Sequence, residues 1–423
     1  MDAKTAHLRI DIDRLIGRLE ALGEIGAVHG PNGERGCARL ALTDADRDGR
    51  DLVVTWMNDM GLLVEVDQVG NVFATLPGRD PELAPVMTGS HIDTVRTGGR
   101  FDGNLGVLAG LEVIETVLTN DLPIERGITI AFFTDEEGAR FAPDMLGSLV
   151  YVGGMGIEEA LDIRATDDDA KLGDELDRIG YSGSRPVPAA SFPHCFVELH
   201  IEQGPILEDA GVDIGVVEGV QGISWTELTI TGQSAHAGTT PMHLRHDPLY
   251  VASAIATFVR ELTTELGGDQ VATVGRMDIH PNLVNVVAST VTMTVDLRNT
   301  SEGVLQDAEE RFRNFVHALA EGEGVEIASR SLARFAPVDF DPAMIDAVEA
   351  TASDLGHSTR RMPSGAGHDA QMLSRVCPTA MIFTPSVGGL SHNIAEFTHA
   401  DDIEAGANVL LHVLLGCAGW SGH

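Results

Sequence analysis

Histidine and carboxylate side chains recur in five short segments of this 423-residue chain. Imidazole nitrogens and carboxylate oxygens, without thiolates, are ligands that suit Zn²⁺ or a neighbouring transition metal. Three consecutive carboxylates also repel one another, and two cations that share a carboxylate would offset this repulsion. Each segment alone could instead hold a structural histidine or form a solvated acidic loop. Together they indicate a metal centre, which would draw its ligands from His91, Asp102, the run Asp135 to Glu137, His200 and His392, with Asp93 beside His91.

Apolar runs of strand length precede four of these segments, at residues 86–88, 128–134, 195–199 and 380–383. Helical patterns alternate with them, for example at residues 107–118 and 344–355. This alternation predicts an α/β domain with a mostly parallel sheet. Because ligands gather at the carboxyl ends of parallel strands, we expect the four strand-end segments to converge.

The middle of the chain has a different pattern. Residues 224–231 and 289–296 alternate polar and apolar side chains, and residues 247–266 and 303–319 read as helices. The combination predicts a smaller α+β domain in which helices cover one face of an antiparallel sheet. We therefore expect a catalytic domain formed by residues 1–215 and 332–423, with residues 216–331 inserted as a lid or dimerisation domain.

The motifs together resemble those of the M20-type di-metal amidohydrolases. The resemblance is to the branch that holds N-carbamoyl-L-amino-acid hydrolases, β-ureidopropionase and allantoate amidohydrolase. It covers nearly the whole chain and rests on GSHIDTVRTGGRFDGNLGV, TDEEGARF, ELHIEQGP, SAHAGTTPM, SGAGHDAQ and GGLSHN. The segments HIEQG and HAGTTPM favour the carbamoylase branch over the peptidases.

The resemblance implies two metal ions, each with its own ligand set. One ion would be bound by His91, Asp102 and His200, and the other by Asp102, Glu137 and His392. Zn²⁺ is the expected metal, with Mn²⁺, Co²⁺ and Ni²⁺ as alternatives.

The remaining carboxylates near these ligands divide into three cases. The resemblance implies that Glu136 is the general base, which takes a proton from water and passes it to the leaving nitrogen. We expect Asp93 to accept the imidazole N–H of His91 and fix its tautomer, although a turn-capping role fits the sequence too. The sequence assigns no role to Asp135.

The inserted domain is expected to bind the substrate. The resemblance implies that His236 stabilises the oxyanion, often in the neighbouring subunit's site, and that the inserted domain forms a homodimer. We expect Arg298 and Asn285 to hold a substrate carboxylate, since an arginine binds carboxylates through two hydrogen bonds. From residue types alone, His236 could be a structural loop histidine and Arg298 could pair with Asp296.

Three further residues of the catalytic domain are expected to contact the substrate. They are Gln203, which follows the ligand His200 closely, and Gly367 and His368 in a glycine-containing loop. The glycines of this loop would let backbone amides approach a ligand.

The expected reaction is hydrolysis of an N-carbamoyl-L-amino acid to the amino acid, CO₂ and ammonia. Allantoate carries two ureido arms and needs extra donors, whereas Gln221 and Trp225 stand where an extra basic residue would be expected. N-carbamoyl-β-alanine differs by one methylene, which a sequence does not resolve. An aminopeptidase and a metal-binding protein without catalysis fit less well, because the carbamoylase motifs and Glu136 are all present.

Composition excludes several other functions. Asp and Glu number 64 against 28 Lys and Arg, so the formal net charge is −36. Such a surface repels nucleic acids and anionic membranes, and it suits either a high-salt cytoplasm or an ordinary acidic protein. No apolar stretch approaches the ~18 residues of a membrane span, and we expect no signal peptide. Four scattered cysteines suit a reducing cytoplasm.

Overall fold

The chain forms two compact units in the computed structural model, which describes residues 7–420. The first unit comprises Met1–Glu218 and Phe340–His423, and the second comprises Gly219–Asp339. The second unit therefore ends later than the predicted boundary at residue 331. The reason is strand β14 (Glu326–Phe335), which stays paired with its neighbour as far as Phe335.

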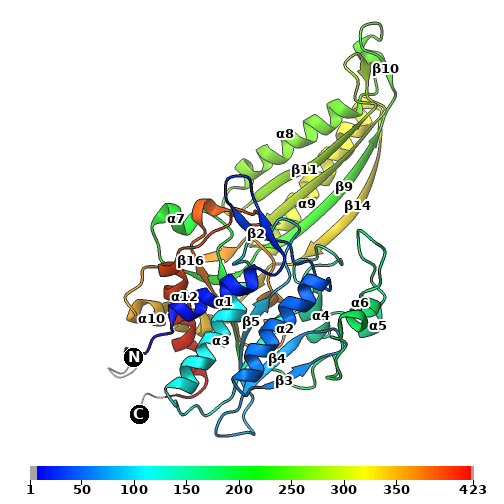
Figure 1. Ribbon diagram of the computed structural model, residues 1–423. Coiled ribbons are helices and arrows are strands. Elements are labelled where there is room, and N and C mark those ends of the chain that lie inside the picture. Colours follow the sequence, from blue (N-terminus) through cyan, green and yellow to red (C-terminus); the bar gives the residue numbers. More distant parts are fainter. Residues whose placement is uncertain (1–6, 421–423) are drawn as a thin grey trace. The chain divides into compact units, whose positions relative to one another are not determined.

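A nine-stranded mixed sheet forms the core of the first unit (Figure 1), and only its short edge strand β15 and the last residues of β8 fall within residues 219–339. Its four central strands, in the order β17-β7-β5-β6, are parallel, and the flanking pairs β8–β17, β15–β8, β6–β4 and β4–β3 are antiparallel. The α/β class is confirmed, with parallel pairing confined to the centre. The strands are β3 (Leu63–Val66), β4 (Val72–Leu76), β5 (Val86–His91), β6 (Ile128–Phe133), β7 (Phe196–Ile201), β8 (Ile214–Val220), β15 (Val338–Asp339), β16 (Thr359–Ser364) and β17 (Thr379–Thr384).

Helices cover both faces of this sheet, as the complete burial of the four central strands requires. Helix α3 (Asn104–Thr119) is buried along most of its length and packs with α12 (Ala400–Cys417) against the central strands. Around them lie α1 (Ile12–Gly23), α2 (Asp44–Asp59), α4 (Leu146–Tyr151), α5 (Ile157–Leu161), α6 (Leu172–Ile179), α7 (Ile206–Ala210), α10 (Pro342–Asp354) and α11 (Asp369–Leu373). A small hairpin, β1 (Ala27–His29) and β2 (Arg35–Cys37), and a short helix η3 (Val387–Gly389) complete the unit.

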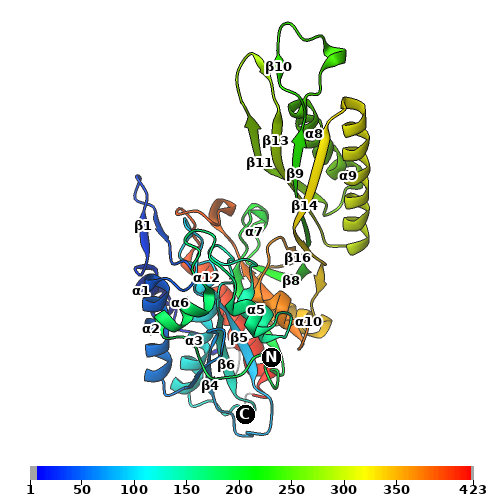
Figure 2. The same cartoon turned by 90° about the vertical axis from the view of Figure 1, so that its right-hand side faces the viewer.

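The second unit is a four-stranded antiparallel sheet with two long helices on one face (Figure 2). The strand order is β11 (Val271–His280), β13 (Thr290–Asn299), β9 (Gly222–Thr231) and β14. Alternate residues of β13 are buried against α8 (Pro248–Leu266) and α9 (Glu302–Glu323), which is the expected one-sided pattern. A separate pair, β10 (Ala235–His236) and β12 (Val286–Val287), and helix η2 (Met242–Leu244) form an extension of this unit.

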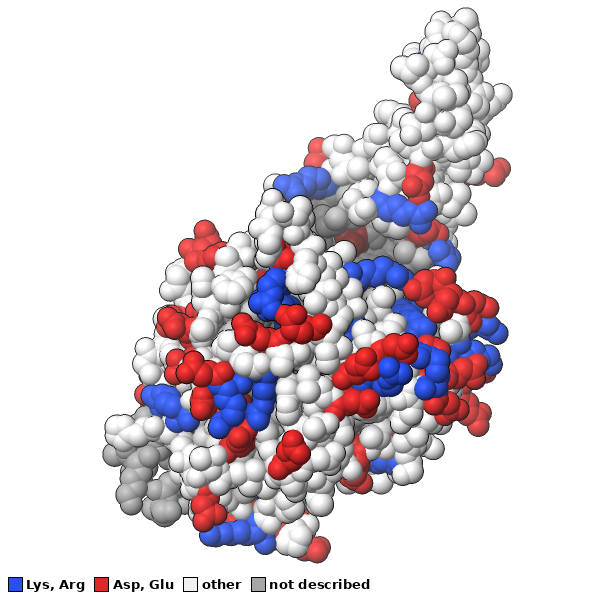
Figure 3. Space-filling model, in the orientation of Figure 1, with Lys and Arg blue, Asp and Glu red and all other residues white. Residues whose placement is uncertain are grey.

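Part of the surface charge is paired, although acidic residues outnumber basic ones by 64 to 28. On the face shown in Figure 3, basic side chains lie among acidic ones. The ion pairs of the structure include those of Arg178 with Asp44 and of Lys171 with Asp162. Among residues 7–420, no helix combines the length and apolar character of a membrane span. All four cysteines are free.

Candidate active site

The predicted metal ligands of the first unit converge at the carboxyl ends of the central strands. His91 ends β5, His200 lies near the end of β7, and Glu137 follows β6. Asp102 stands just before Gly103, the residue that caps the start of α3. Gly103 has φ of 65°, and a Cβ at this position would lie 2.4 Å from the His91 ring, so only glycine lets α3 begin so close to the histidine.

The carboxylate of Asp102 lies between two groups of donor atoms. Its Oδ1 atom is 3.6 Å from His91 Nε2 and 3.2 Å from His200 Nε2. Its Oδ2 atom is 3.6 Å from His392 Nε2, which in turn lies 3.2 Å from Glu137 Oε2. The two sets, His91–Asp102–His200 and Asp102–Glu137–His392, each bring their donor atoms within 4.8 Å of one another. These are the residues that the family resemblance groups into two ligand sets.

Backbone carbonyls orient the two buried histidines. His91 Nδ1 is 2.9 Å from the carbonyl oxygen of Asp93, and His200 Nδ1 is 2.8 Å from that of Ile201. Since a carbonyl only accepts, Nδ1 carries a proton in both rings, and Nε2 is the nitrogen that would be offered to a metal ion. The prediction for Asp93 needs correction here, because its backbone carbonyl accepts the imidazole N–H while its carboxylate lies 3.9 Å away.

Glu136 and Glu137 point to different partners although they are adjacent. Glu136 Oε2 is 3.4 Å from His91 Nε2, whereas Glu137 Oε2 faces His392. The preceding residue, Asp135, has a φ of 56°, which turns the chain sharply after β6. Asp135 is fully buried, and its Oδ1 accepts the N–H of Phe141 at 3.4 Å. The residue that the sequence left without a role therefore supports the turn that separates the two glutamates.

Burial and clustered charge shift the pKa values of the titratable side chains in the site. Burial raises the pKa of Glu136 well above its ordinary value, and burial together with the charge of Asp93 does the same for Asp135. Burial alone would lower the pKa of His91, but the charges of Glu136 and its neighbours raise it well above its usual range. Divalent cations among these donors would reverse the balance and favour ionised carboxylates and neutral histidines.

Three polar residues that the sequence analysis missed lie in or next to the site, and two of them contact Asp102. Glu396 Oε1 accepts the backbone N–H groups of Phe101 and Asp102, each at 3.1 Å. Ser391 Oγ donates to Asp102 Oδ2 at 2.8 Å. Glu198, which accepts from Ser90 and from the N–H of Ala370, lies in the middle of strand β7. An acidic residue inside an apolar strand was the signal that could have identified Glu198.

Two residues expected to contact substrate have other partners in the structure. Gln203 donates its side-chain N–H to Asp102 Oδ2 at 2.9 Å. His368 is buried, its ring packs against that of His200 with centroids 4.5 Å apart, and its Nε2 lies 2.9 Å from Ser364 Oγ. Burial is also the main cause that lowers the pKa of His368 well below its usual value, which keeps the ring neutral. Gly367, at the half-buried turn before it, carries no side chain and leaves its backbone close to Asp144 and Met145.

The predicted residues of the second unit lie in two places within that unit. His236 and Asn285 are exposed and adjacent, since Ala237 donates its N–H to the carbonyl of Asn285 at 3.0 Å and β10 pairs with β12. Arg298 lies on β13, where it donates to both carboxylate oxygens of Asp296 and sits over the Trp225 ring at 5.7 Å. The ion pair left open by the sequence is thus present in this structure.

Comparison with known proteins gives consistent matches over most of the chain. The model of the peptidase family M20/M25/M40 matches residues 87–416. An N-carbamoyl-L-amino-acid amidohydrolase of Rhizobium meliloti is 42% identical over 420 residues, 99% of each chain. An allantoate amidohydrolase of Bacillus subtilis is 33% identical and covers 92% of this chain and 94% of its own. The crystal structure of a hydantoinase/carbamoylase family amidase from Burkholderia multivorans superposes with a TM-score of 0.92 at 45% identity, covering 97% of this chain and 98% of that one.

Proposed function

This chain belongs to the peptidase M20/M25/M40 family, and from that premise we propose that it hydrolyses N-carbamoyl-L-amino acids to the amino acid, CO₂ and ammonia. The observation that carries the proposal is the pair of histidine and carboxylate sets that share Asp102. The substrate follows the relative of Rhizobium meliloti, which is more similar than the allantoate amidohydrolase of Bacillus subtilis.

The donor atoms fit two divalent cations. The three members of each set are nitrogen and oxygen donors, and the two oxygens of Asp102 face different sets. We assign His91, Asp102 and His200 to one ion, and Asp102, Glu137 and His392 to the other, with Zn²⁺ as the expected metal. When bound, such ions supply Lewis acidity, which polarises a carbonyl group and makes water more acidic.

Glu136 is assigned as the general base. It lies beside His91 but belongs to neither donor set, so its carboxylate is left to accept a proton from water and to deliver it to the leaving nitrogen. The turn at Asp135 holds it apart from Glu137, and the Asp93 carboxylate accepts the N–H groups of both glutamates. These contacts would fix the position of the base.

The second unit is assigned the recognition of the substrate. Arg298 donates to both carboxylate oxygens of Asp296. The carboxylate of an amino acid could be bound through its two oxygens in the same way. We assign the substrate carboxylate to Arg298 and Asn285, and the developing oxyanion to the exposed imidazole of His236.

The second unit is also assigned to homodimer formation. Its extension around β10 shows few charged side chains in Figure 3. Met242, Leu244, Leu283 and Val284 of this extension are exposed, with Met242 at 75%. Exposed apolar residues gathered in this way mark an interaction surface, and we propose that a second copy of the chain covers it. The free cysteines accord with the cytoplasm as the site of action.

A substrate panel tests the proposal. The purified protein would be freed of metal, reconstituted with Zn²⁺, Mn²⁺, Co²⁺ or Ni²⁺, and assayed for ammonia release. Several N-carbamoyl-L-amino acids, N-carbamoyl-β-alanine, allantoate and a dipeptide would be compared by kcat/KM. We expect the N-carbamoyl-L-amino acids to give the highest values. Higher values for allantoate would replace the proposal with the second activity, and cleavage of the dipeptide alone would reject both.

A further inference from the structure

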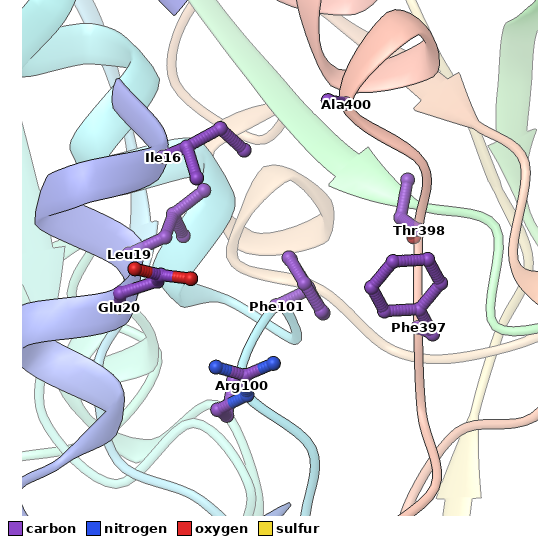
Figure 4. Close-up of a pocket in the computed structure, with 8 residues that line it drawn as sticks. All are labelled: Ile16, Leu19, Glu20, Arg100, Phe101, Phe397, Thr398 and Ala400. Atoms are coloured by element: carbon purple, nitrogen blue, oxygen red, sulfur yellow. The ribbon is translucent and has the colours of Figure 1, made fainter. Parts of the chain in front are cut away.

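A cavity lies in the first unit, beside the loop that carries Asp102. Its volume is about 180 Å³, and it lies between helix α1, the end of that loop and the segment before α12 (Figure 4). The lining residues are Ile16, Leu19, Glu20, Arg100, Phe101, Phe397, Thr398 and Ala400. An engineered cavity of ~150 Å³ admits benzene, so this space is large enough for a small ligand with an apolar side chain.

The walls of the cavity are mostly apolar. The rings of Phe101 and Phe397 meet edge to face with centroids 5.8 Å apart, and both line the space together with Ile16 and Leu19. Phe397 is 41% exposed, which leaves apolar surface without cover. Hydrophobic walls with a few polar groups are typical of a small-molecule site.

Opposite charges stand at one end of the cavity. Figure 4 shows Glu20 and Arg100 there, next to α1. The Nε atom of Arg100 is buried without a hydrogen-bond partner, and no ion pair joins the two side chains among the contacts of residues 7–420. The hydroxyl of Thr398, a residue only 1% exposed, is likewise buried without a partner.

We propose that this cavity binds a free α-amino acid with an aliphatic or aromatic side chain. Its carboxylate would accept hydrogen bonds from Arg100, and its ammonium group would donate to Glu20. The side chain would fill the space between the two phenylalanine rings and α1. A simple fatty acid would satisfy only Arg100, and an amine only Glu20, so the pair of opposite charges selects a zwitterion.

The position of the cavity connects it to the metal-binding loop. Arg100 and Phe101 immediately precede Asp102, and Phe397 follows Glu396, whose carboxylate accepts the N–H groups of Phe101 and Asp102. A ligand that contacts both phenylalanines therefore touches two segments that are joined by the hydrogen bonds from the backbone of Phe101 and Asp102 to Glu396. Because a free amino acid is the product of the proposed reaction, we infer that its occupancy of this site changes kcat, an effect that rests on the proposed function.

Calorimetry with three probes tests the binding. L-Norleucine carries both charges, hexanoate lacks the ammonium group and pentylamine lacks the carboxylate. We expect norleucine to bind the wild-type protein at least about tenfold more tightly than either analogue, as a charge-assisted hydrogen bond allows. Glu20→Gln should lower the affinity for norleucine about tenfold without changing the affinity for hexanoate. Arg100→Gln should lower the affinity for both of these probes. Asp13→Asn, which removes an exposed carboxylate of α1 outside the cavity, should change the affinity for neither probe.

The outcomes separate this site from the active site. If hexanoate binds as tightly as norleucine, or if Glu20→Gln leaves norleucine binding unchanged, the amino-acid site is rejected. At saturating substrate, norleucine should change the wild-type kcat but not that of Glu20→Gln, whereas competition at the active site alone would alter only the apparent KM and would reject the link. Since the binding arm needs no turnover, a protein that binds norleucine in this way but releases no ammonia from carbamoyl amino acids would reject the proposed function alone.

Discussion

The carboxylate of Asp93 accepts the backbone N–H of Glu136 at a distance of 3.3 Å. The same carboxylate accepts the N–H of Glu137 at 3.4 Å, while the backbone carbonyl of Asp93 holds the imidazole of His91. One buried residue thus connects a predicted metal ligand on β5 with the proposed base and a second ligand after β6. The relative positions of three functional side chains depend on it.

Asp93→Asn should therefore impair the site without unfolding the protein. An amide has one acceptor oxygen and one donor group, so one of the two glutamate N–H groups would face another donor. Loss of such a supporting contact typically lowers metal affinity or activity by about 10–100-fold. Metal titration and kcat measure the effect, with the exposed Asp209→Asn as the control. Wild-type values for both quantities would show that Asp93 does not organise the site.

Glu136→Gln and Glu137→Gln should separate the roles of adjacent residues. The first change removes the proposed base but leaves both donor sets complete, so bound metal should be retained while kcat falls about 10²–10⁴-fold. The second change removes one member of the Asp102–Glu137–His392 set, so metal content should fall. Elemental analysis and kcat of the two variants decide the matter. Equal metal loss in both would contradict the assignment of Glu136.

Arg298→Ala should weaken binding of a carboxylate-bearing substrate. Loss of a charge-assisted hydrogen bond costs about 1.5–3 kcal/mol of binding free energy. Where KM reflects the Kd of the substrate, KM should therefore rise about 10–100-fold. Arg330→Ala is a suitable control, because Arg330 also lies in the second unit and pairs with Glu227 on the sheet surface. An unchanged KM for Arg298→Ala would mean that the substrate carboxylate is bound elsewhere.

The convergence of the strand-end segments was predictable because strand ends meet by topology, whereas the division into two donor sets was implied by the family resemblance. His91, His200 and Glu137 each follow an apolar run, and parallel strands deliver their carboxyl ends to one edge. The contacts between those ends were not predictable. Whether the carboxylate or the carbonyl of Asp93 meets His91 depends on the backbone path after β5, which residue types do not specify.

The missed residues share a physical cause. Glu396 and Ser391 lie in an irregular segment after η3, where no periodicity indicates which side chains turn inward. Gln203 was expected at the substrate because it follows the ligand His200 closely, and His368 because it lies in a glycine-containing loop. In the folded chain these side chains meet His200 and Asp102 instead, because buried donors and acceptors must be paired.

Asp67 offers a test of pH-dependent stability away from the metal ligands. It is fully buried, and its Oδ1 accepts the N–H groups of Val69 and Asn71 while Oδ2 accepts from the Asn71 side chain. Burial raises the pKa of Asp67 to about 6, despite the opposing hydrogen bonds. In the unfolded chain an aspartate has a pKa of about 3.9. The folded protein therefore holds this proton more tightly than the unfolded chain does.

The sign of the effect follows from linkage. The contribution of Asp67 to stability is fully present below pH ~3.9 and is lost as the pH rises through about 6, by about 3 kcal/mol in all. Asp67→Asn does not titrate, so the wild type should lose about 1 kcal/mol relative to this variant between pH 5 and pH 7. Urea denaturation of both proteins at pH 5, 6 and 7 measures the difference. The part of the difference in unfolding free energy that is the same at every pH reflects the replacement of the carboxyl group by an amide. If the whole difference is the same at pH 5, 6 and 7, Asp67 is ionised throughout this range.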